Sequence, residues 1–168
     1  MLITVEVRSV NVDEWEAARD IRLAALADSP SAFGSTLQRE FAFDELDWGR
    51  RVEGGHWFLA WRGDQPVGIA AGLREDDRPL ERHLVAMWVA PNHRGTLVAA
   101  ELVEAVCAWA QDQDAQSVTL WVADGNARGR RFYERLGFRS TGERQPLPSA
   151  PDVGEERMQR NLSSSPDG

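Results

Sequence analysis

The segment covering residues 80–111 constrains the fold of this chain more than any other part of the sequence. Residues 80–89 become apolar on both faces toward their end, which is typical of a strand buried at the centre of a sheet. Pro91 ends that strand, and in residues 97–111 apolar positions recur with the period of an amphipathic helix. A buried strand that leads into a one-sided helix indicates a domain of mixed strands and helices.

The remaining elements follow from periodicity and from turn residues. Alternating β-branched and polar residues predict a half-buried strand at residues 2–8, and Asn11 with Glu14 predicts a capping box before a helix at about 12–27. Residues 29–43 show no sustained period, so we expect a loop there. Further strands are expected at 57–61, 67–73, 117–122, from 138 and at 153–161, and further helices at 44–52 and 126–136.

Length and charge exclude several classes of protein. A chain of 168 residues with 42% hydrophobic residues can bury one core, so we expect one domain at 1–162 and a disordered polar tail at 163–168. The net charge of −8 argues against a nucleic-acid partner; it would tolerate a cationic substrate, or it could serve solubility alone. No apolar run approaches the ~20 residues of a membrane helix, so we expect a cytoplasmic protein without a membrane partner.

Neither the single cysteine nor the loop histidines point to catalysis or metal binding. Cys107 lies in an apolar periodic stretch, which favours a buried structural thiol over a nucleophile. His56 and His93 have no cysteine or acidic partner at the spacing of metal ligands, so we expect no metal site.

The turn between the buried strand and the long helix could bind an anion. Free backbone N–H groups at the start of a helix, together with Arg94, would suit a pyrophosphate. Taken alone, the segment favours an ordinary strand-to-helix turn with a solvated arginine, because its glycine content is poor and short glycine motifs are weak evidence.

A second segment, taken together with this turn, makes the interpretation of the anion site more specific. Residues 87–95 (MWVAPNHRG) and 126–138 (NARGRRFYERLGF) together resemble the GCN5-related N-acetyltransferases, the GNAT superfamily. The resemblance implies an α/β fold with a mixed, mostly antiparallel sheet of six or seven strands and about four helices. It also implies that two central strands splay apart and hold the pantetheine arm of acetyl-CoA between them.

The resemblance implies a set of cofactor-binding residues. Leu97 stands where the family places a glycine; we expect its backbone to be helical and its side chain to turn toward the core. Asn126 equally suits the N-cap of its helix, and Arg131 belongs to a basic cluster that could be a solvated helix face. The implied residues are Met87, Trp88, Val89, Arg94, Gly95, Thr96, Leu97, Val98, Ala99, Ala100, Asn126 and Arg131.

Three residues are candidates for proton transfer. The resemblance places Tyr133 near the sulfur, where its hydroxyl could protonate the departing thiolate; the alternative is a tyrosine packed between helix and sheet. His83 is the leading candidate for the general base, with Glu81 in reserve, and the alternative is a histidine at the rim of the strand. Strict alternation would place His83 on the same face as Val85 and Met87.

The sequence does not identify the acceptor. The resemblance implies that the loop with Phe33, Gly34 and Ser35 forms a lid over a primary amine of a small molecule or peptide, which attacks acetyl-CoA directly. The acidic residues Glu40, Asp44, Glu45 and Asp47 would favour a cation, but they could equally be helix-dipole partners. A non-catalytic acyl-CoA sensor, transfer of another acyl group or to a hydroxyl, and a homodimer all stay open.

Overall fold

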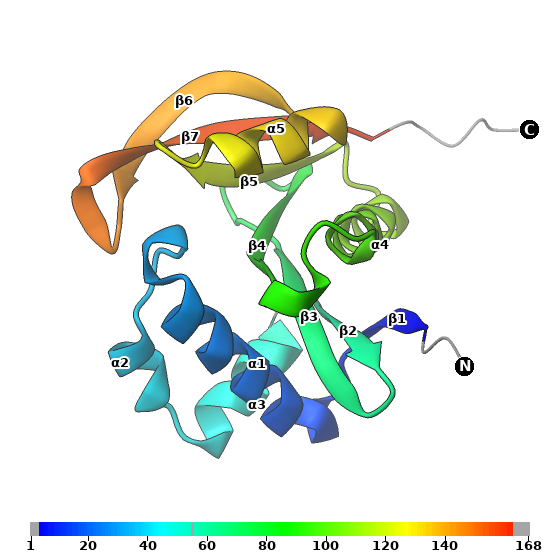
Figure 1. Cartoon of the computed structure of the whole chain (residues 1–168). Coiled ribbons are helices and arrows are strands. Elements are labelled where there is room, and N and C mark those ends of the chain that lie inside the picture. Colours follow the sequence, from blue (N-terminus) through cyan, green and yellow to red (C-terminus); the bar gives the residue numbers. More distant parts are fainter. Residues whose placement is uncertain (1–3, 55, 163–168) are drawn as a thin grey trace, which may run out of the picture.

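The computed structural model describes residues 4–54 and 56–162, and these form a single seven-stranded sheet with helices on both sides (Figure 1). The mixed sheet confirms the fold class expected from the sequence. The predicted tail at 163–168 and the first residues of the first predicted strand lie outside the described residues. Within the described ranges, no helix is long and apolar enough to cross a membrane.

The strands follow the spatial order β1-β2-β3-β4-β5-β7-β6. The β4–β5 pair is parallel, and α4 forms its crossover, whereas the other neighbours are antiparallel. The strands are β1 (Val5–Ser9), β2 (His56–Arg62), β3 (Gln65–Leu73), β4 (Glu81–Val89), β5 (Ser117–Ala123), β6 (Arg139–Leu147) and β7 (Ala150–Asn161).

The helices largely match the predicted segments. Asn11 and Glu14 form the predicted capping box. The loop predicted at 29–43 is wrong in part, because it contains the short α2, whose start is capped by the Thr36 side chain and whose Glu40 is buried. The helices are α1 (Trp15–Asp28), α2 (Leu37–Phe41), α3 (Glu45–Gly54), α4 (Val98–Asp112) and α5 (Ala127–Arg135).

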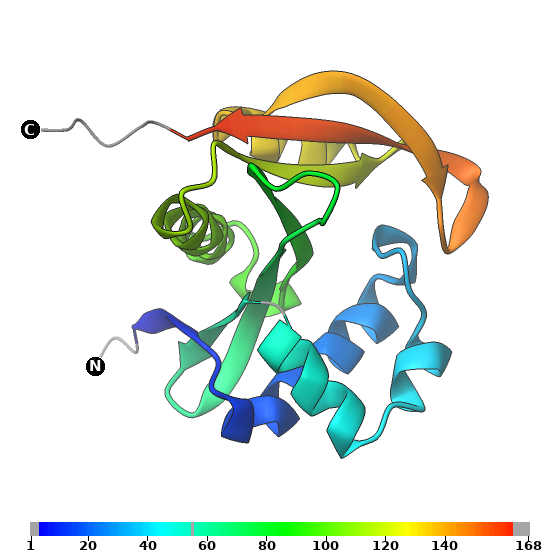
Figure 2. The same cartoon turned by 180° about the vertical axis from the view of Figure 1, so that it is seen from behind.

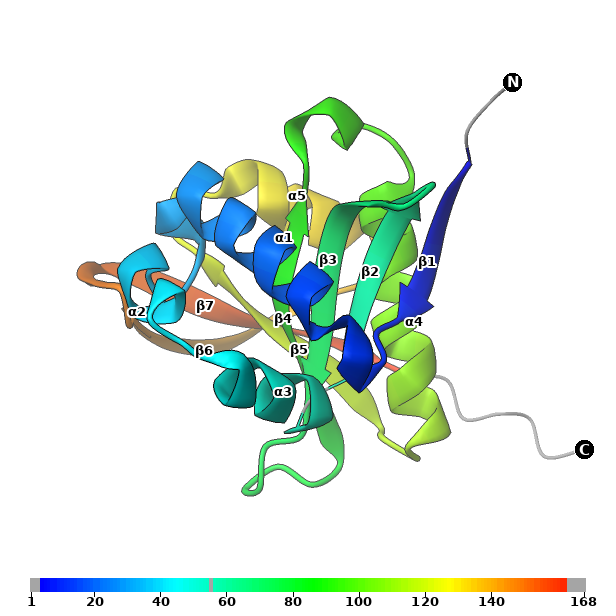
Figure 3. The same cartoon turned by 90° about the horizontal axis from the view of Figure 1, so that it is seen from below.

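The helices divide the sheet into two sides, which we call the α4 side and the α1 side. On the α4 side, α4 packs into the main core, and a Cβ at Gly68 of β3 would lie only 2.9 Å from the Leu102 side chain. Close approach of the sheet to α4 therefore depends on glycine at position 68. On the α1 side, α1 and α3 cover β2 and β3 around Ile21, Val52 and Leu59 (Figure 3).

A bulge in β4 changes which way its side chains point. Ala86 has a φ of +60°, and the register with β3 shifts at this point. Val85 and Ala86 both pack on the α1 side, whereas Met87 packs against the core of the α4 side. The expectation that His83, Val85 and Met87 share one face is thus wrong for Met87, because an extra residue in a strand inverts the alternation after it.

The strands β4 and β5 separate after a short paired stretch. Their last register pair is His83 with Thr119, although β4 continues to pair with β3 as far as Val89. Beyond Thr119, β5 pairs only with β7, and the two central strands visibly diverge (Figure 1). The splayed central strands implied by the resemblance are therefore present. Each strand has backbone groups on its inner edge that lack a strand partner.

Candidate functional site

The start of α4 lies beside the separated end of β4. Leu97 has φ −77° and ψ −5°, so its backbone is helical as expected. The expectation that its side chain turns inward is wrong, because Leu97 is 74% exposed while Val98 and Leu102 occupy the core. Gly95 has a φ of +76°, a left-handed conformation that favours glycine.

Backbone N–H groups are available in the first turn of α4. The first helical hydrogen bond runs from Glu101 N–H to the Leu97 carbonyl oxygen. Val98 N–H donates to Thr96 Oγ1 at 3.3 Å, while the Thr96 hydroxyl donates to the His93 carbonyl oxygen at 2.6 Å. The amides of the first turn precede the helical ladder and carry the positive end of the helix dipole. The turn can therefore receive a negatively charged group.

Arg94 is held by the end of α1. Its Nη2 lies 2.5 Å from Asp28 Oδ2, and its Nε donates to the Val89 carbonyl oxygen at 3.0 Å. Trp88 Nε1 donates to the same Asp28 oxygen, and these hydrogen bonds, chiefly that from Arg94, lower the pKa of Asp28 to about 2. In this state the Arg94 guanidinium neutralises a carboxylate of the chain itself.

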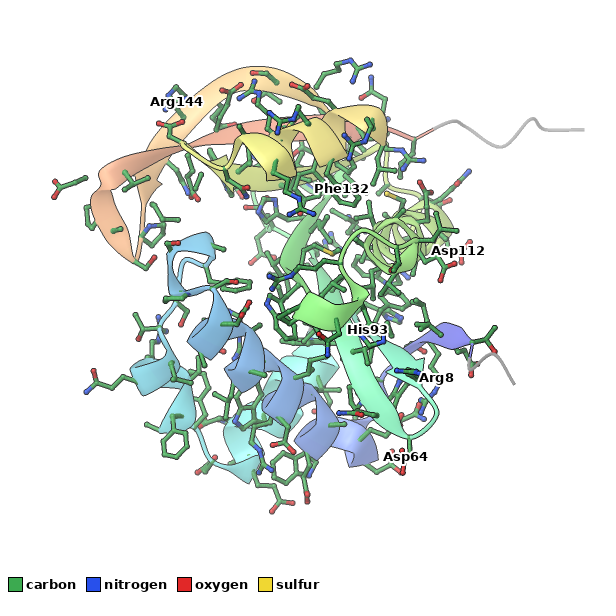
Figure 4. The ribbon with its side chains drawn as sticks, in the orientation of Figure 1. Arg8, Asp64, His93, Asp112, Phe132 and Arg144 are labelled. Carbon is green, nitrogen blue, oxygen red and sulfur yellow. The ribbon has the colours of Figure 1, made fainter. Side chains whose placement is uncertain are left out.

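Helix α5 positions two of the predicted residues at the other side of the splay. Asn126 is its N-cap, since its Oδ1 accepts from Gly129 N–H at 3.0 Å. Tyr133 packs against Phe132, Phe138 and the core of the α4 side, and burial raises its pKa. Its neighbour Phe132 lies on the side of α5 that faces the rest of the molecule (Figure 4). Arg131 is exposed on the outer surface of α5.

His83 lies at the point where β4 and β5 part. It is 7% exposed, and its Nδ1 lies 2.8 Å from Thr119 Oγ1 and 3.7 Å from Glu75 Oε1. Burial lowers the pKa of His83 to about 4; Arg157 contributes in the same direction, and Glu75 opposes it. The imidazole is therefore neutral at pH 7, as a proton acceptor must be.

Sequence reasoning missed Arg157, the residue that organises the surroundings of His83. Arg157 is 2% exposed, and its Nη2 donates to Glu75 Oε1 at 2.7 Å, Thr119 Oγ1 at 2.9 Å and Glu81 Oε2 at 3.1 Å. Glu81, the reserve base, is thus engaged in an ion pair. No local signal marks Arg157, because an arginine in a strand ordinarily faces solvent.

The predicted lid residues make a contact between distant parts of the chain. Phe33 is buried under the Arg22 guanidinium, and its carbonyl oxygen accepts from Ser149 Oγ at 2.5 Å. Gly34 lies against Pro148. The segment between α1 and α2 therefore touches the turn of the β6–β7 hairpin, which curves past the end of β5 (Figure 2).

Three of the four acidic residues that could favour a cation are engaged in contacts within the chain. Glu40 is buried between Arg22 and Arg51, with N···O distances of 3.0 and 2.5 Å. Asp44 and Asp47 accept hydrogen bonds from each other's backbone N–H at the start of α3. These carboxylates serve local structure, so the sequence-based idea that they attract a cationic acceptor loses its support.

Comparison with known proteins gives the chain a family context. Residues 16–138 match the family described as the acetyltransferase (GNAT) family. An uncharacterized N-acetyltransferase of Mycobacterium bovis is 41% identical over 78 residues, or 46% of this chain and 49% of that protein. N-acetyltransferase 8F1 of Rattus norvegicus is 34% identical over 93 residues, or 54% of this chain and 42% of that protein. The aligned segments span about half the length of these curated relatives.

Solved structures share the fold at low sequence identity. An acetyltransferase of the GNAT family from Streptococcus pneumoniae superposes with a TM-score of 0.77 at 13% identity, covering 95% of this chain and 100% of that one. The structure of yncA from Salmonella typhimurium, with its cofactor acetyl-CoA, gives a TM-score of 0.75 at 17% identity, covering 98% and 99%.

Proposed function

Because the chain belongs to the GNAT acetyltransferase family, we propose that it transfers the acetyl group of acetyl-CoA to a primary amine of a small molecule or peptide. The observation that carries this proposal is the end of β4–β5 pairing at His83 and Thr119. Unpaired strand edges bind extended chains by backbone hydrogen bonds, as an added strand does. Acetyl-CoA is the donor substrate of the family, and its pantetheine arm has this extended character.

The residues of the chain fit this donor. The inner edge of β4 at Met87, Trp88 and Val89 would pair with the pantetheine arm, and the first-turn amides of α4 would hold the pyrophosphate. A main-chain site of this kind tolerates Leu97, because its backbone is already helical. Bound acetyl-CoA supplies the activated acetyl group, and the chain supplies orientation and proton transfer.

His83 acts as the general base in this proposal. If His83 Nδ1–H donates to Thr119 Oγ1, Nε2 keeps its lone pair for the proton of the attacking amine. Thr119 can accept from both His83 and Arg157, because a hydroxyl oxygen has two lone pairs. Glu81 is the weaker candidate, since its carboxylate is engaged in ion pairs with Arg157 and Arg78.

Tyr133 acts as the proton donor to the departing thiolate. The phenol is protonated at neutral pH, as a proton donor must be, and the raised pKa that its burial causes excludes a phenolate base. A covalent acyl-enzyme through Cys107 is disfavoured, because burial raises the pKa of that thiol to about 11. Direct attack by the amine is the route that remains.

A non-catalytic acyl-CoA sensor is the second candidate function. It is favoured by the exposed Leu97 at the glycine position and by the ion pair that commits Arg94 to Asp28. In a sensor, the Arg94–Asp28 ion pair withholds a positive charge from the pyrophosphate and Leu97 replaces the glycine, while neither feature affects the splay of β4 and β5.

Thiol release from acetyl-CoA distinguishes the two functions. The purified chain is incubated with acetyl-CoA alone and then with a panel of primary amines, and acetyl-CoA affinity is measured by calorimetry. All 19 basic side chains are arginine, so no lysine of the chain competes as an acceptor. Release that requires an added amine supports the transferase. Binding without release supports the sensor, and absence of binding at millimolar acetyl-CoA rejects both.

The variant Tyr133→Phe tests the proton donor. It keeps the ring packing against Phe132 and Phe138 but removes the hydroxyl, so kcat should fall by about 10²-fold or more. The affinity for acetyl-CoA, measured by calorimetry, should stay unchanged. An unaltered kcat in a folded variant would show that Tyr133 is only a packing residue.

A further inference from the structure

Glu155 of β7 is a buried carboxylate on the α1 side of the sheet, the side that carries His83. Its neighbour Glu156 pairs with Arg130 of α5, and Met158 lies in the core of the α4 side. Since side chains alternate along a strand, Glu155 and Arg157 point to the opposite side. Glu155 is in register with Ala123, at the end of β5 that has parted from β4.

The Glu155 carboxylate lacks a cationic partner. It is 6% exposed, and Gln145 Nε2 donates to its Oε1 at 2.6 Å. No arginine within residues 4–54 and 56–162 forms an ion pair with it, because the nearby Arg144 and Arg157 bind other carboxylates. Burial raises the pKa of Glu155 and the bond from Gln145 only partly opposes this shift. Burying a charge in this way is unfavourable unless a counter-charge arrives.

The charged groups around His83 also carry an excess of negative charge. The side chains of Glu75, Glu81 and Glu143 surround Arg78 and Arg157, which leaves one negative charge. His83 is neutral at pH 7. Glu155 adds a second negative charge, so these carboxylates outnumber Arg78 and Arg157 by two, and a cation is favoured near them.

We infer that Glu155, oriented by Gln145, forms a subsite for a cationic group of the acceptor other than the nitrogen that is acetylated. This inference rests on the proposed function. A carboxylate stabilises the protonated form of an amine, whereas the reacting amine must be neutral. Four residues of β5 separate the register positions of His83 and Glu155, about 13 Å along the strand, and the two residues lie on either side of β5, about 10 Å apart across the sheet. The acceptor class is therefore a diamine, or an amine with a second basic group.

Paired acceptors test the subsite. The probes are α,ω-diaminoalkanes of increasing length, each compared with the n-alkylamine of the same length, in the amine-dependent release of thiol from acetyl-CoA. We expect a lower KM for the diamine in the unaltered protein. Glu155→Gln should raise the KM for the diamine by about 10- to 100-fold, the loss of one charge-assisted hydrogen bond. Its kcat and its kinetics with the monoamine should change little.

Asp152→Asn is the matched control. Asp152 is an exposed residue of the same strand, and its substitution removes the same charge from a side chain at the surface. It should leave the kinetics of both amines unchanged. An equal loss for diamine and monoamine in Glu155→Gln, or an equal effect of Asp152→Asn, would overturn the subsite.

A binding measurement separates failure of the subsite from failure of the proposed function. If no amine releases thiol, the transferase proposal fails, and the diamines are then titrated calorimetrically against the protein with CoA present. Diamine binding that Glu155→Gln abolishes and Asp152→Asn preserves would sustain the subsite in a protein without turnover. Absence of binding, or binding that both variants preserve, would reject it.

Discussion

The two sides of the central strands bury opposite kinds of chemistry. On the α4 side, alternate residues of β5 and β7 are apolar and fully packed, as Leu120, Val122 and Met158 show. On the α1 side, their immediate neighbours Thr119 and Arg157 are equally buried but polar. One face of the same strands therefore stabilises the fold, while the other holds groups whose burial is unfavourable unless they are paired.

This difference agrees with the proposed position of the chemistry. Buried polar groups are retained where they bind or react, often at a cost in stability. The polar cluster begins at His83, where β4 and β5 part, and follows β7 to Glu155, where the splay is open. The comparison of the two sides can be tested by changing neighbouring residues that point in opposite directions.

The largest effect on stability is expected on the α4 side. Leu120→Ala should lower the free energy of unfolding by about 2–5 kcal/mol, because it leaves a cavity in the core. Its neighbour Thr119 is the control: Thr119→Val should cost about 1–3 kcal/mol, because His83 and Arg157 each lose a partner, and it should also reduce the acetylation rate of the folded protein. Urea unfolding and turnover measure both effects. A folded Thr119→Val variant with an unchanged acetylation rate would mean that the two sides do not differ in this way.

An effect of intermediate size on the free energy of unfolding is expected at His83, and it should depend on pH. Its pKa of about 4 in the folded chain lies below the ordinary value of 6.5, so the unfolded chain binds the proton first as the pH falls. Stability from this group is present above pH 6.5 and is lost between pH 6.5 and 4, by about 2–3 kcal/mol.

Urea unfolding across this range, compared with His83→Gln, measures the contribution of His83. The variant keeps a polar side chain that cannot titrate, so its stability should fall less between pH 6.5 and 4. Identical pH dependence in the two proteins would show that the imidazole is not held in its neutral form.

The smallest effect is expected at Glu155. Since burial raises its pKa above the ordinary value of 4.5, stability from this group is present below pH 4.5 and is lost as the pH rises. Glu155→Gln removes the buried charge, so at pH 7 the thermal midpoint should stay equal or rise slightly. A clear fall in the midpoint would identify Glu155 as a structural residue and not a binding residue.

Much of the fold follows from local patterns that survive in the structure. The apolar period of α4 places Val98, Leu102 and Val106 in the core as predicted. The predicted positions of Asn126 and Tyr133 are confirmed as an N-cap and as a residue of α5 packed against the core, although their roles toward acetyl-CoA remain proposals. The sequence predicts these features because helix period and capping act within a few residues.

By itself, the sequence determined the order of the elements, the α4 core face and the two family segments. Only the tertiary structure decided that the bulge at Ala86 turns Met87 to the α4 side and that Leu97 is exposed. It also decided that Arg157 shares Thr119 with His83 and that Glu155 is buried further along β7. Such features depend on pairing between strands far apart in the chain. Periodicity cannot encode that pairing, since a shift of one residue inverts the face of every side chain that follows.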